Sequence, residues 1–465
     1  MEVLGILLSL FLLMFFAYRG YSVIVFAPVF AILAAASQGL SPMPAYTELF
    51  MAKAAVYFKS FFPIFLLGAV FGKIMEETGL AKAIAYRILQ AVGKERSILS
   101  IVIAGGVLTY GGISLFVVVF AIYPFAASMF KEADIPKRLI PGCIVLGACT
   151  YTMDALPGTP QIQNIIPTSF FGTTVYAAPI LGIIGGVFIF VGGMYYLEWR
   201  NKTAKARGEG YGENHINEPA EIDINNMPDW RLAMVPLLAV LVMNYIMNNI
   251  FIWDPNILEP FKAMKLPLMA PAVKNVAAIW SLIISVVIGI SLAVAIGFRN
   301  LPSGGLAKAL NAGAIGSLLA IMNTASEVGY GNVIAMLPGF ESIANALLGI
   351  QIGGTPLVSM AVTVTTLAGI TGSASGGLSI ALDLMAKDWL AWANAIGMSP
   401  AVLHRVAAMA SGGMDSMPHN GVVITLLAIC GLTHKQSYPD IFALVLIKTT
   451  AAFLIIAVYM MTGLV

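Results

Sequence analysis

Charged residues are scarce in this sequence. Asp, Glu, Lys and Arg make up 10% of its 465 residues, whereas about a quarter of the residues of a soluble domain are charged. Hydrophobic residues reach 59%, above the roughly 45–50% that is typical of soluble folds. This composition excludes a soluble globular protein and predicts a multi-pass protein of the cell membrane.

The chain also lacks the features of nucleic-acid-binding, metal-binding and redox proteins. Its 25 Lys and Arg nearly balance its 23 Asp and Glu, and they are dispersed, so nucleic acid has no basic surface to bind. The three cysteines, Cys143, Cys149 and Cys430, lie in apolar runs without the spacing of a metal site. We therefore expect no nucleic-acid partner, no metal site and no cofactor.

Apolar stretches long enough to cross about 30 Å of hydrocarbon recur along the chain. They predict an all-α polytopic membrane protein, and the first stretch lacks the basic segment of a signal peptide, so we expect it to be retained. Lys and Arg in the short connections favour an outside N-terminus and a cytoplasmic linker at 200–230, in which His215 faces solvent. The predicted spans are 3–17, 21–36, 61–77, 139–170, 175–198, 231–251, 276–296, 308–337, 399–431 and 439–461.

Two longer apolar stretches, 97–129 and 356–394, are each interrupted by a polar, glycine-rich centre. Each is too long for one crossing, and irregular backbone at mid-membrane depth must be buried in protein or line a wet cavity. We predict that both are re-entrant hairpins, with tips at residues 109–114 and 371–379.

Two of the predicted spans, 139–170 and 399–431, are cut by polar clusters that contain proline. The first cluster includes Met153-Asp154-Ala155-Leu156-Pro157, and the second includes Met414-Asp415-Ser416-Met417-Pro418. Proline removes a backbone donor and clashes with the preceding helical turn. Both spans are therefore predicted to be helices broken at midplane.

These motifs recur in the same order and at nearly equal separations in the two halves. Gly-Gly-Ile-Ser at 111–114 returns as Gly-Gly-Leu-Ser at 376–379, and the Met-Asp-x-Leu-Pro motif returns as Met-Asp-x-Met-Pro. We predict a first repeat at 1–199 and a second at 231–465, each with five spans and one hairpin. Because five crossings is an odd number, the second repeat is inverted, which is an architecture of secondary transporters.

Three segments resemble those of the gluconate permease (GntP-type) family, within the ion-transporter superfamily of dicarboxylate and citrate carriers. They are Tyr110-Gly111-Gly112-Ile113-Ser114, the stretch TASEVGYG at 324–331 and the run GGMDSMPHNG at 412–421. The sequence looks closest to the hydroxybutyrate permease branch. The resemblance implies uptake of a small hydroxycarboxylate such as 3-hydroxybutyrate, driven by a proton or a sodium gradient. It also implies elevator-like alternating access, a homodimer and a place in the bacterial inner membrane.

A carboxylate at midplane needs positive potential, and we expect no Lys or Arg near the hairpin tips or helix breaks. The N-termini of the half-helices are then expected to supply it, and glycine lets substrate oxygens approach the backbone. The structural alternative is that these small residues only pack helices closely. The candidate substrate ligands are Thr109, Tyr110, Gly111, Gly112, Ser114, Thr159, Ser373, Ser375, Gly376, Gly377, Ser379, His419 and Asn420.

Ionisable residues inside a membrane are costly and point to function. Asp154, Glu327, Asp415 and His419 are the candidates for proton coupling. The alternatives are that the two aspartates cap the half-helices that follow the breaks, and that Glu327 is a neutral acid bonded to backbone. His404 and Arg405, beside Pro400, and His434 are expected to lie at the membrane interface.

Three other functions are consistent with parts of the pattern. A gluconate or other sugar-acid symporter differs from the hydroxybutyrate reading only in substrate. An anion channel is a second alternative. An intramembrane serine hydrolase with Ser375 as nucleophile is the third, but Ser373 stands where the Gly-x-Ser-Gly pattern requires glycine, and no His-Glu-x-x-His motif occurs. We therefore expect a transporter and not an enzyme.

Overall fold

The structure is a computed structural model. It describes residues 2–19, 21–113, 115–213, 215–219, 227–266, 268, 270, 272–301, 305–418 and 420–465. These residues form helices and connecting turns without a β-strand, which confirms the predicted all-α class. The candidate ligands Ser114 and His419 lie outside the described residues.

The first part of the chain forms α1 to α10, with π-helical turns before α4 and α9. The helices are α1 (Glu2–Tyr18), α2 (Val23–Ser37), α3 (Pro42–Pro44), α4 (Met51–Glu77), α5 (Leu80–Val92), α6 (Ser97–Tyr110), α7 (Leu115–Glu132), α8 (Ile140–Ala148), α9 (Ile162–Phe171) and α10 (Pro179–Ala206). The π-helical turns are Ala45–Phe50 and Tyr151–Ala155.

The second part repeats this series of long and short helices, with short α12 as an addition. Its helices are α11 (Trp230–Asn249), α12 (Glu259–Ala263), α13 (Ala277–Gly297), α14 (Gly305–Met336), α15 (Pro338–Leu348), α16 (Leu357–Thr371), α17 (Ala374–Ala395), α18 (Pro400–Ser411), α19 (Gly421–Cys430) and α20 (His434–Thr462).

Six helical segments of the described chain are long and apolar enough to cross a membrane. They are Pro42–Glu77, Pro179–Ala206, Trp230–Asn249, Ala277–Asn300, Gly305–Met336 and His434–Thr462. The prediction of a span at 61–77 was too short, because Lys53 and Lys59 lower the hydropathy upstream without ending the helix. The predicted spans 3–17 and 21–36 form the shorter apolar helices α1 and α2.

The helices are interrupted at all four places where the sequence predicts it. α6 ends at Tyr110 and α7 begins at Leu115, while α16 ends at Thr371 and α17 begins at Ala374. The spans with the Met-Asp motifs form α8 and α9 in one half and α18 and α19 in the other. Asp154 and Asp415 therefore lie in the interruptions and not in continuous helices.

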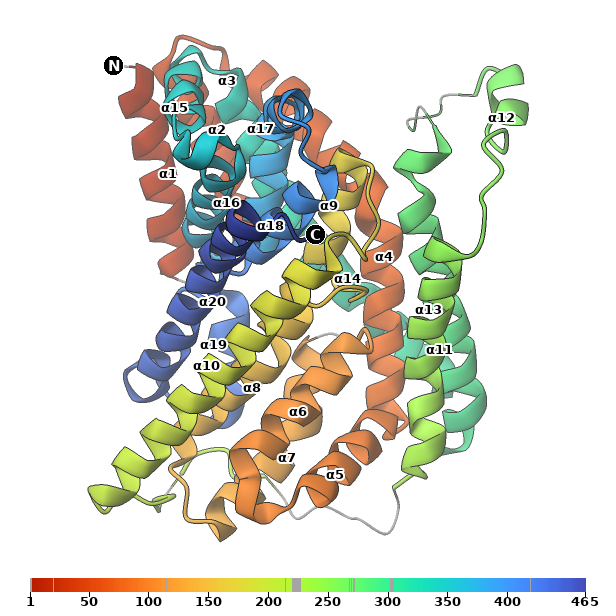
Figure 1. Ribbon diagram of the computed structural model, residues 1–465, viewed down its shortest axis with the longest axis vertical. Coiled ribbons are helices and arrows are strands. Elements are labelled where there is room, and N and C mark those ends of the chain that lie inside the picture. The colour runs from red at the N-terminus through yellow and green to blue at the C-terminus, as the bar shows by residue number, and fades with distance from the viewer. Residues whose placement is uncertain are drawn as a thin grey trace.

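The packing of the two halves is reciprocal. α4 packs along α14 and α10 along α20, while α1 pairs with α2 and α11 with α13. α9 contacts α17 and α18, and in the same way α19 contacts α7 and α8. In Figure 1, α5, α6 and α7 lie at one end of the molecule, and α15, α16 and α17 lie at the other.

The polar linker is more ordered than its composition suggests. Residues 200–206 continue α10, and the segment after it packs on α7, on the turn before α8 and on α19. Lys137 Nζ donates to the Ile216 carbonyl at 3.0 Å and to Glu218 at 2.8 Å. His215 is partly buried against Tyr211, so the prediction that it simply faces solvent was wrong. These contacts tie the linker to elements of both halves.

Replacement of Gly377 by alanine tests the close packing of α17 on α16. A Cβ at Gly377 would collide with the backbone of Ala368, so G377A is expected to lower the free energy of unfolding by roughly 1–3 kcal/mol. Gly316 in α14 has open space at its Cβ position, and G316A is expected to preserve or raise stability because alanine favours helix. Equal melting temperatures of the two purified variants would contradict this packing.

Candidate functional site

A buried lysine lies between the two helix breaks. Lys448 of α20 is 1% exposed, and its Nζ donates to the Cys149 carbonyl at 2.7 Å and to Asp415 Oδ1 at 3.1 Å. Asp154 Oδ2 lies 3.6 Å from the same Nζ. The expectation that no Lys or Arg lies near the breaks was therefore wrong. Lys448 lies in the middle of the predicted span 439–461. A lysine inside a membrane span is itself a signal of function, but the high hydropathy of the span hid it.

The duplicated aspartates do not cap the half-helices that follow them. The N-cap of α19 is Asn420, whose Oδ1 accepts hydrogen bonds from the backbone of Val422 at 2.6 Å and Val423 at 3.2 Å. The N-cap of α9 is Gln161, which makes no side-chain capping bond. The carboxyls of Asp154 and Asp415 instead face Lys448. The capping alternative is thus excluded.

Arg405 holds the first break in place. Its side chain is fully buried, and its guanidinium donates to the Ala177 carbonyl at 2.9 Å, the Asp154 carbonyl at 3.2 Å and Asn164 Oδ1 at 3.1 Å. The neighbouring His404 is also buried, with its ring nitrogens 2.6 Å from Thr173 Oγ1 and 3.2 Å from Asn164 Oδ1. The interfacial positions predicted for both were wrong, because the short α18 is enclosed by α9, α16, α17 and α20.

The first hairpin tip rests on the first break. Tyr110 Oη donates to the Pro157 carbonyl at 2.8 Å, and Gln161 Nε2 donates to the Thr109 carbonyl at 2.7 Å. The hydroxyls of Thr109 and Thr159 are buried without a partner among the described residues. Gly111 packs against Leu237 of α11, and Gly112, at φ 90°, contacts Pro160. The structure therefore brings this set of candidate ligands together.

The second tip rests on the second break in a similar way. Asn420 Nδ2 donates to the carbonyls of Gly372 and Asp415, each at 2.8 Å. Ser373 is the N-cap of α17, and its Oγ accepts a hydrogen bond from the Gly376 amide at 3.1 Å. Asn420 and Ser373 thus hold the local backbone, and Gly377 lies against α16.

The side chain of Glu327 reaches the start of α17 from a neighbouring helix. It belongs to α14 and is 3% exposed, and its Oε2 touches Gly376, where any Cβ would collide with it. Oε2 has no hydrogen-bond partner among the described residues, and the same holds for Tyr57 Oη and Ser379 Oγ nearby. Ser375 Oγ is 3.4 Å from Thr324 Oγ1. Buried polar atoms without partners are uncommon in native structures, and a water molecule, an ion or a ligand can satisfy them.

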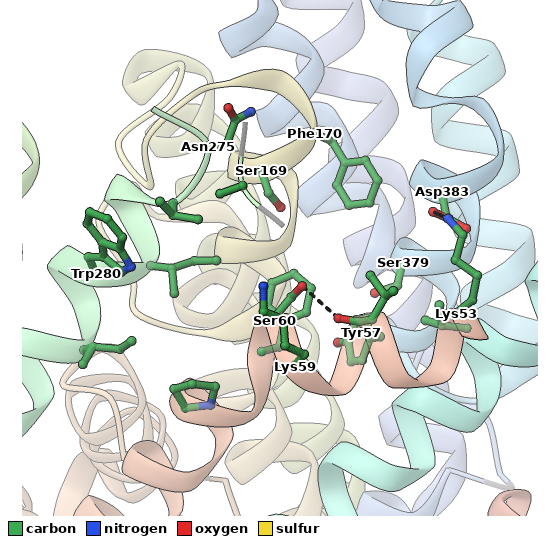
Figure 2. Close-up of a pocket in the computed structure, with 18 residues that line it drawn as sticks. Lys53, Tyr57, Lys59, Ser60, Ser169, Phe170, Asn275, Trp280, Ser379 and Asp383 are labelled. Carbon is green, nitrogen blue, oxygen red and sulfur yellow. Dashed lines mark hydrogen bonds and ion pairs between the residues drawn. The ribbon is translucent and has the colours of Figure 1, made fainter. Parts of the chain in front are cut away.

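A cavity of about 420 Å³ opens beside this group (Figure 2). Tyr57 and Ser379 line it, so the cavity reaches the side chains that surround Glu327. Lys53 of α4 also lines the cavity and pairs with Asp383 of α17 at 2.7 Å. The other polar residues that line the cavity are Lys59, Ser60, Ser169, Asn275 and Trp280. Tyr57, Lys53 and Lys59 were missed because they belong to a helix that the hydropathy pattern truncated.

The described residues contain no group of three or more His, Cys, Asp or Glu side chains that could hold a metal ion. The candidate acids Asp154, Asp415 and Glu327 instead lie in two places, the first two around Lys448 and the third at the start of α17. Long apolar helices, broken helices and buried acids at the breaks together define a multi-pass membrane transport protein.

Comparisons with known proteins agree with this class. The model of the GntP family of permeases matches residues 1–405. The "Uncharacterized transporter YxjC" of Bacillus subtilis is 53% identical over the full length of both chains. An "Uncharacterized permease" of Haemophilus influenzae is 23% identical over 39% of this chain and 37% of its own. The chain belongs to the GntP family of permeases, and as a permease it is a transporter and needs no cofactor.

A solved structure has the same fold. The crystal structure of the Alcanivorax borkumensis YdaH transporter, described as revealing an unusual topology, aligns with a TM-score of 0.54. The alignment covers 93% of this chain and 97% of that chain at 14% identity. At this identity the likeness concerns the fold alone, and it supports a polytopic helical membrane protein.

Substitution of Arg405 tests whether its fork of donors holds the first break. R405K keeps the charge but replaces a planar set of five donors by a single ammonium. It leaves buried carbonyls without partners at a cost of about 1–3 kcal/mol each, so we expect a lower melting temperature. Arg299 is exposed, and R299K should melt like the wild type. Wild-type stability of R405K in detergent would contradict the role of the guanidinium.

Proposed function

We propose that this permease is a secondary active transporter that takes up a small hydroxycarboxylate, such as 3-hydroxybutyrate, together with protons. The observation that carries the proposal is the unpartnered carboxyl oxygen of Glu327 at the N-terminus of α17, beside a cavity. Gluconate or another sugar acid is the alternative substrate.

A carboxylate suits this place for electrostatic reasons. The first amides of a helix have no intrahelical partner and carry a partial positive charge, so they bind anions. α17 presents them with the hydroxyls of Ser373, Ser375 and Ser379 close by. Lys53 and Lys59 line the cavity that leads there. The small number of polar side chains around the tip favours a short hydroxy acid over a polyhydroxylated sugar acid.

Glu327 supplies the proposed coupling to protons. Its carboxyl and the substrate carboxylate compete for one helix N-terminus, and two negative charges in a site of low dielectric repel each other strongly. Protonation of Glu327 removes this repulsion and frees the N-terminus of α17 for the substrate. Substrate therefore binds with a proton, and release of both on the other side resets the carrier.

The proposed movement is a sliding of one body against another. The reciprocal packing of the two halves supports the predicted inverted repeats, and we assign the hairpins and broken helices to the moving body. Glu327 on α14 and Lys53 on α4 then contact α17 across the boundary between the bodies. We also propose the homodimer that the family resemblance implies.

Glu327→Gln tests the coupling role. Because the amide is permanently neutral, E327Q is expected to exchange labelled substrate across proteoliposomes but to lose accumulation driven by a pH gradient. Glu341 on α15 is exposed, and E341Q is a matched control that should behave as the wild type. Undiminished pH-driven accumulation by E327Q would remove Glu327 from the coupling mechanism.

Substrate identity is tested by uptake of labelled 3-hydroxybutyrate and gluconate into proteoliposomes under an imposed pH or sodium gradient. We expect 3-hydroxybutyrate to accumulate with the pH gradient, to saturate and to show counterflow. Accumulation of gluconate alone would assign the sugar-acid function instead. Conductance without counterflow would identify a channel.

A further inference from the structure

The atoms around the Lys448 ammonium form a set of oxygens from three residues in the two breaks. They are the Cys149 carbonyl at 2.7 Å, both carboxyl oxygens of Asp415 at 3.1 and 3.2 Å, and Asp154 Oδ2 at 3.6 Å. Cys149 directly follows the end of α8, so its carbonyl is freed by the break. Carboxylates and carbonyls released at broken helices are the ligands that small metal cations take in membrane carriers.

The ammonium is not available to bind substrate. Lysine has three donors, and the three short contacts of Nζ go to Cys149 and Asp415. The residue is 1% exposed, and Gly412 lies so close that a Cβ there would collide with Asp154 and with the Lys448 side chain. The surrounding residues therefore pack tightly on the Lys448 ammonium and leave it no free donor.

We propose that the Lys448 ammonium is a built-in cation that occupies the place of a bound sodium ion between the two broken helices. Arg405 bonds the Asp154 backbone carbonyl and lies near enough to attract the Asp154 carboxylate, so two positive charges accompany the two carboxyls and the cluster is balanced without a metal ion. The assembly of the two breaks then needs no sodium. This conclusion rests on the proposed function: if the carrier has no sodium site here, the proton is its coupling ion.

The test uses the melting temperature of the purified full-length protein in detergent, in NaCl, LiCl, KCl and choline chloride at equal ionic strength. The wild type is expected to melt at the same temperature in all four salts. Lys448→Ala retains the oxygens but not the ammonium, so it should be least stable in choline chloride. Saturating sodium is expected to raise its melting temperature by about 5 °C, as a ligand that binds only the folded state does.

Two further variants locate the effect. Lys435 is exposed on the same helix, and K435A should show no salt-specific change. D415N/K448A lacks a carboxylate of the site, and its response to sodium should be lost.

Two results would overturn the proposal. One is a sodium-specific stabilisation of the wild type, which means that a metal site exists beside the lysine. The other is a K448A variant that melts at the same temperature in all four salts, which means that the oxygens have no affinity for sodium, or one that does not fold even in NaCl, which means that sodium cannot replace the ammonium. Because these measurements need no substrate, failure of the hydroxycarboxylate assignment would leave them intact, and their failure would leave that assignment standing.

Discussion

Backbone groups that leave a helix inside a bilayer have no water to bond, so the protein itself must supply their partners. This constraint governs the centre of the permease, where the helices are interrupted at four places. Asn420 satisfies carbonyls of the second tip and break, and Arg405 does so around the first break. Lys448 donates a hydrogen bond to the Cys149 carbonyl at the end of α8. The chain thus places its few polar side chains where the backbone is open.

The same side chains also balance the charge of the centre. An isolated charge in a low-dielectric interior costs several kcal/mol, and the cost is offset only by close partners. Asp154 and Asp415 come from different halves and share Lys448. Arg405, which bonds the Asp154 backbone, adds a second positive charge. Removal of any one of these four charges leaves the cluster unbalanced, and the shared lysine joins the two breaks into one unit.

The local features of the fold were predictable from sequence because their signals are local. Hydropathy gives the helices, and glycine and proline give the interruptions around Gly112, Pro157 and Gly372. Contacts between side chains that are far apart in the sequence were not predictable in this way. Lys448 is 33 residues from Asp415 and 299 from Cys149 in the chain, and no spacing rule links them. Arg405 follows a proline that looks like the end of a span, yet helix packing buries it.

The two acid sites differ in a way that suits different tasks. Asp415 accepts hydrogen bonds from Lys448, and Asp154 lies 3.6 Å from the same ammonium without a hydrogen bond. Glu327 Oε2 has no hydrogen-bond partner in the described part of the chain, and no ion pair to Glu327 is formed there. Glu327 stands four residues before Gly331, whereas Gly68 stands four residues before Gly72 in the first part of the chain. The proposed mechanism therefore uses a single working carboxyl. In the proposed mechanism, one proton then accompanies one monoanion, no net charge moves, and the pH difference drives uptake with about 1.36 kcal/mol per unit.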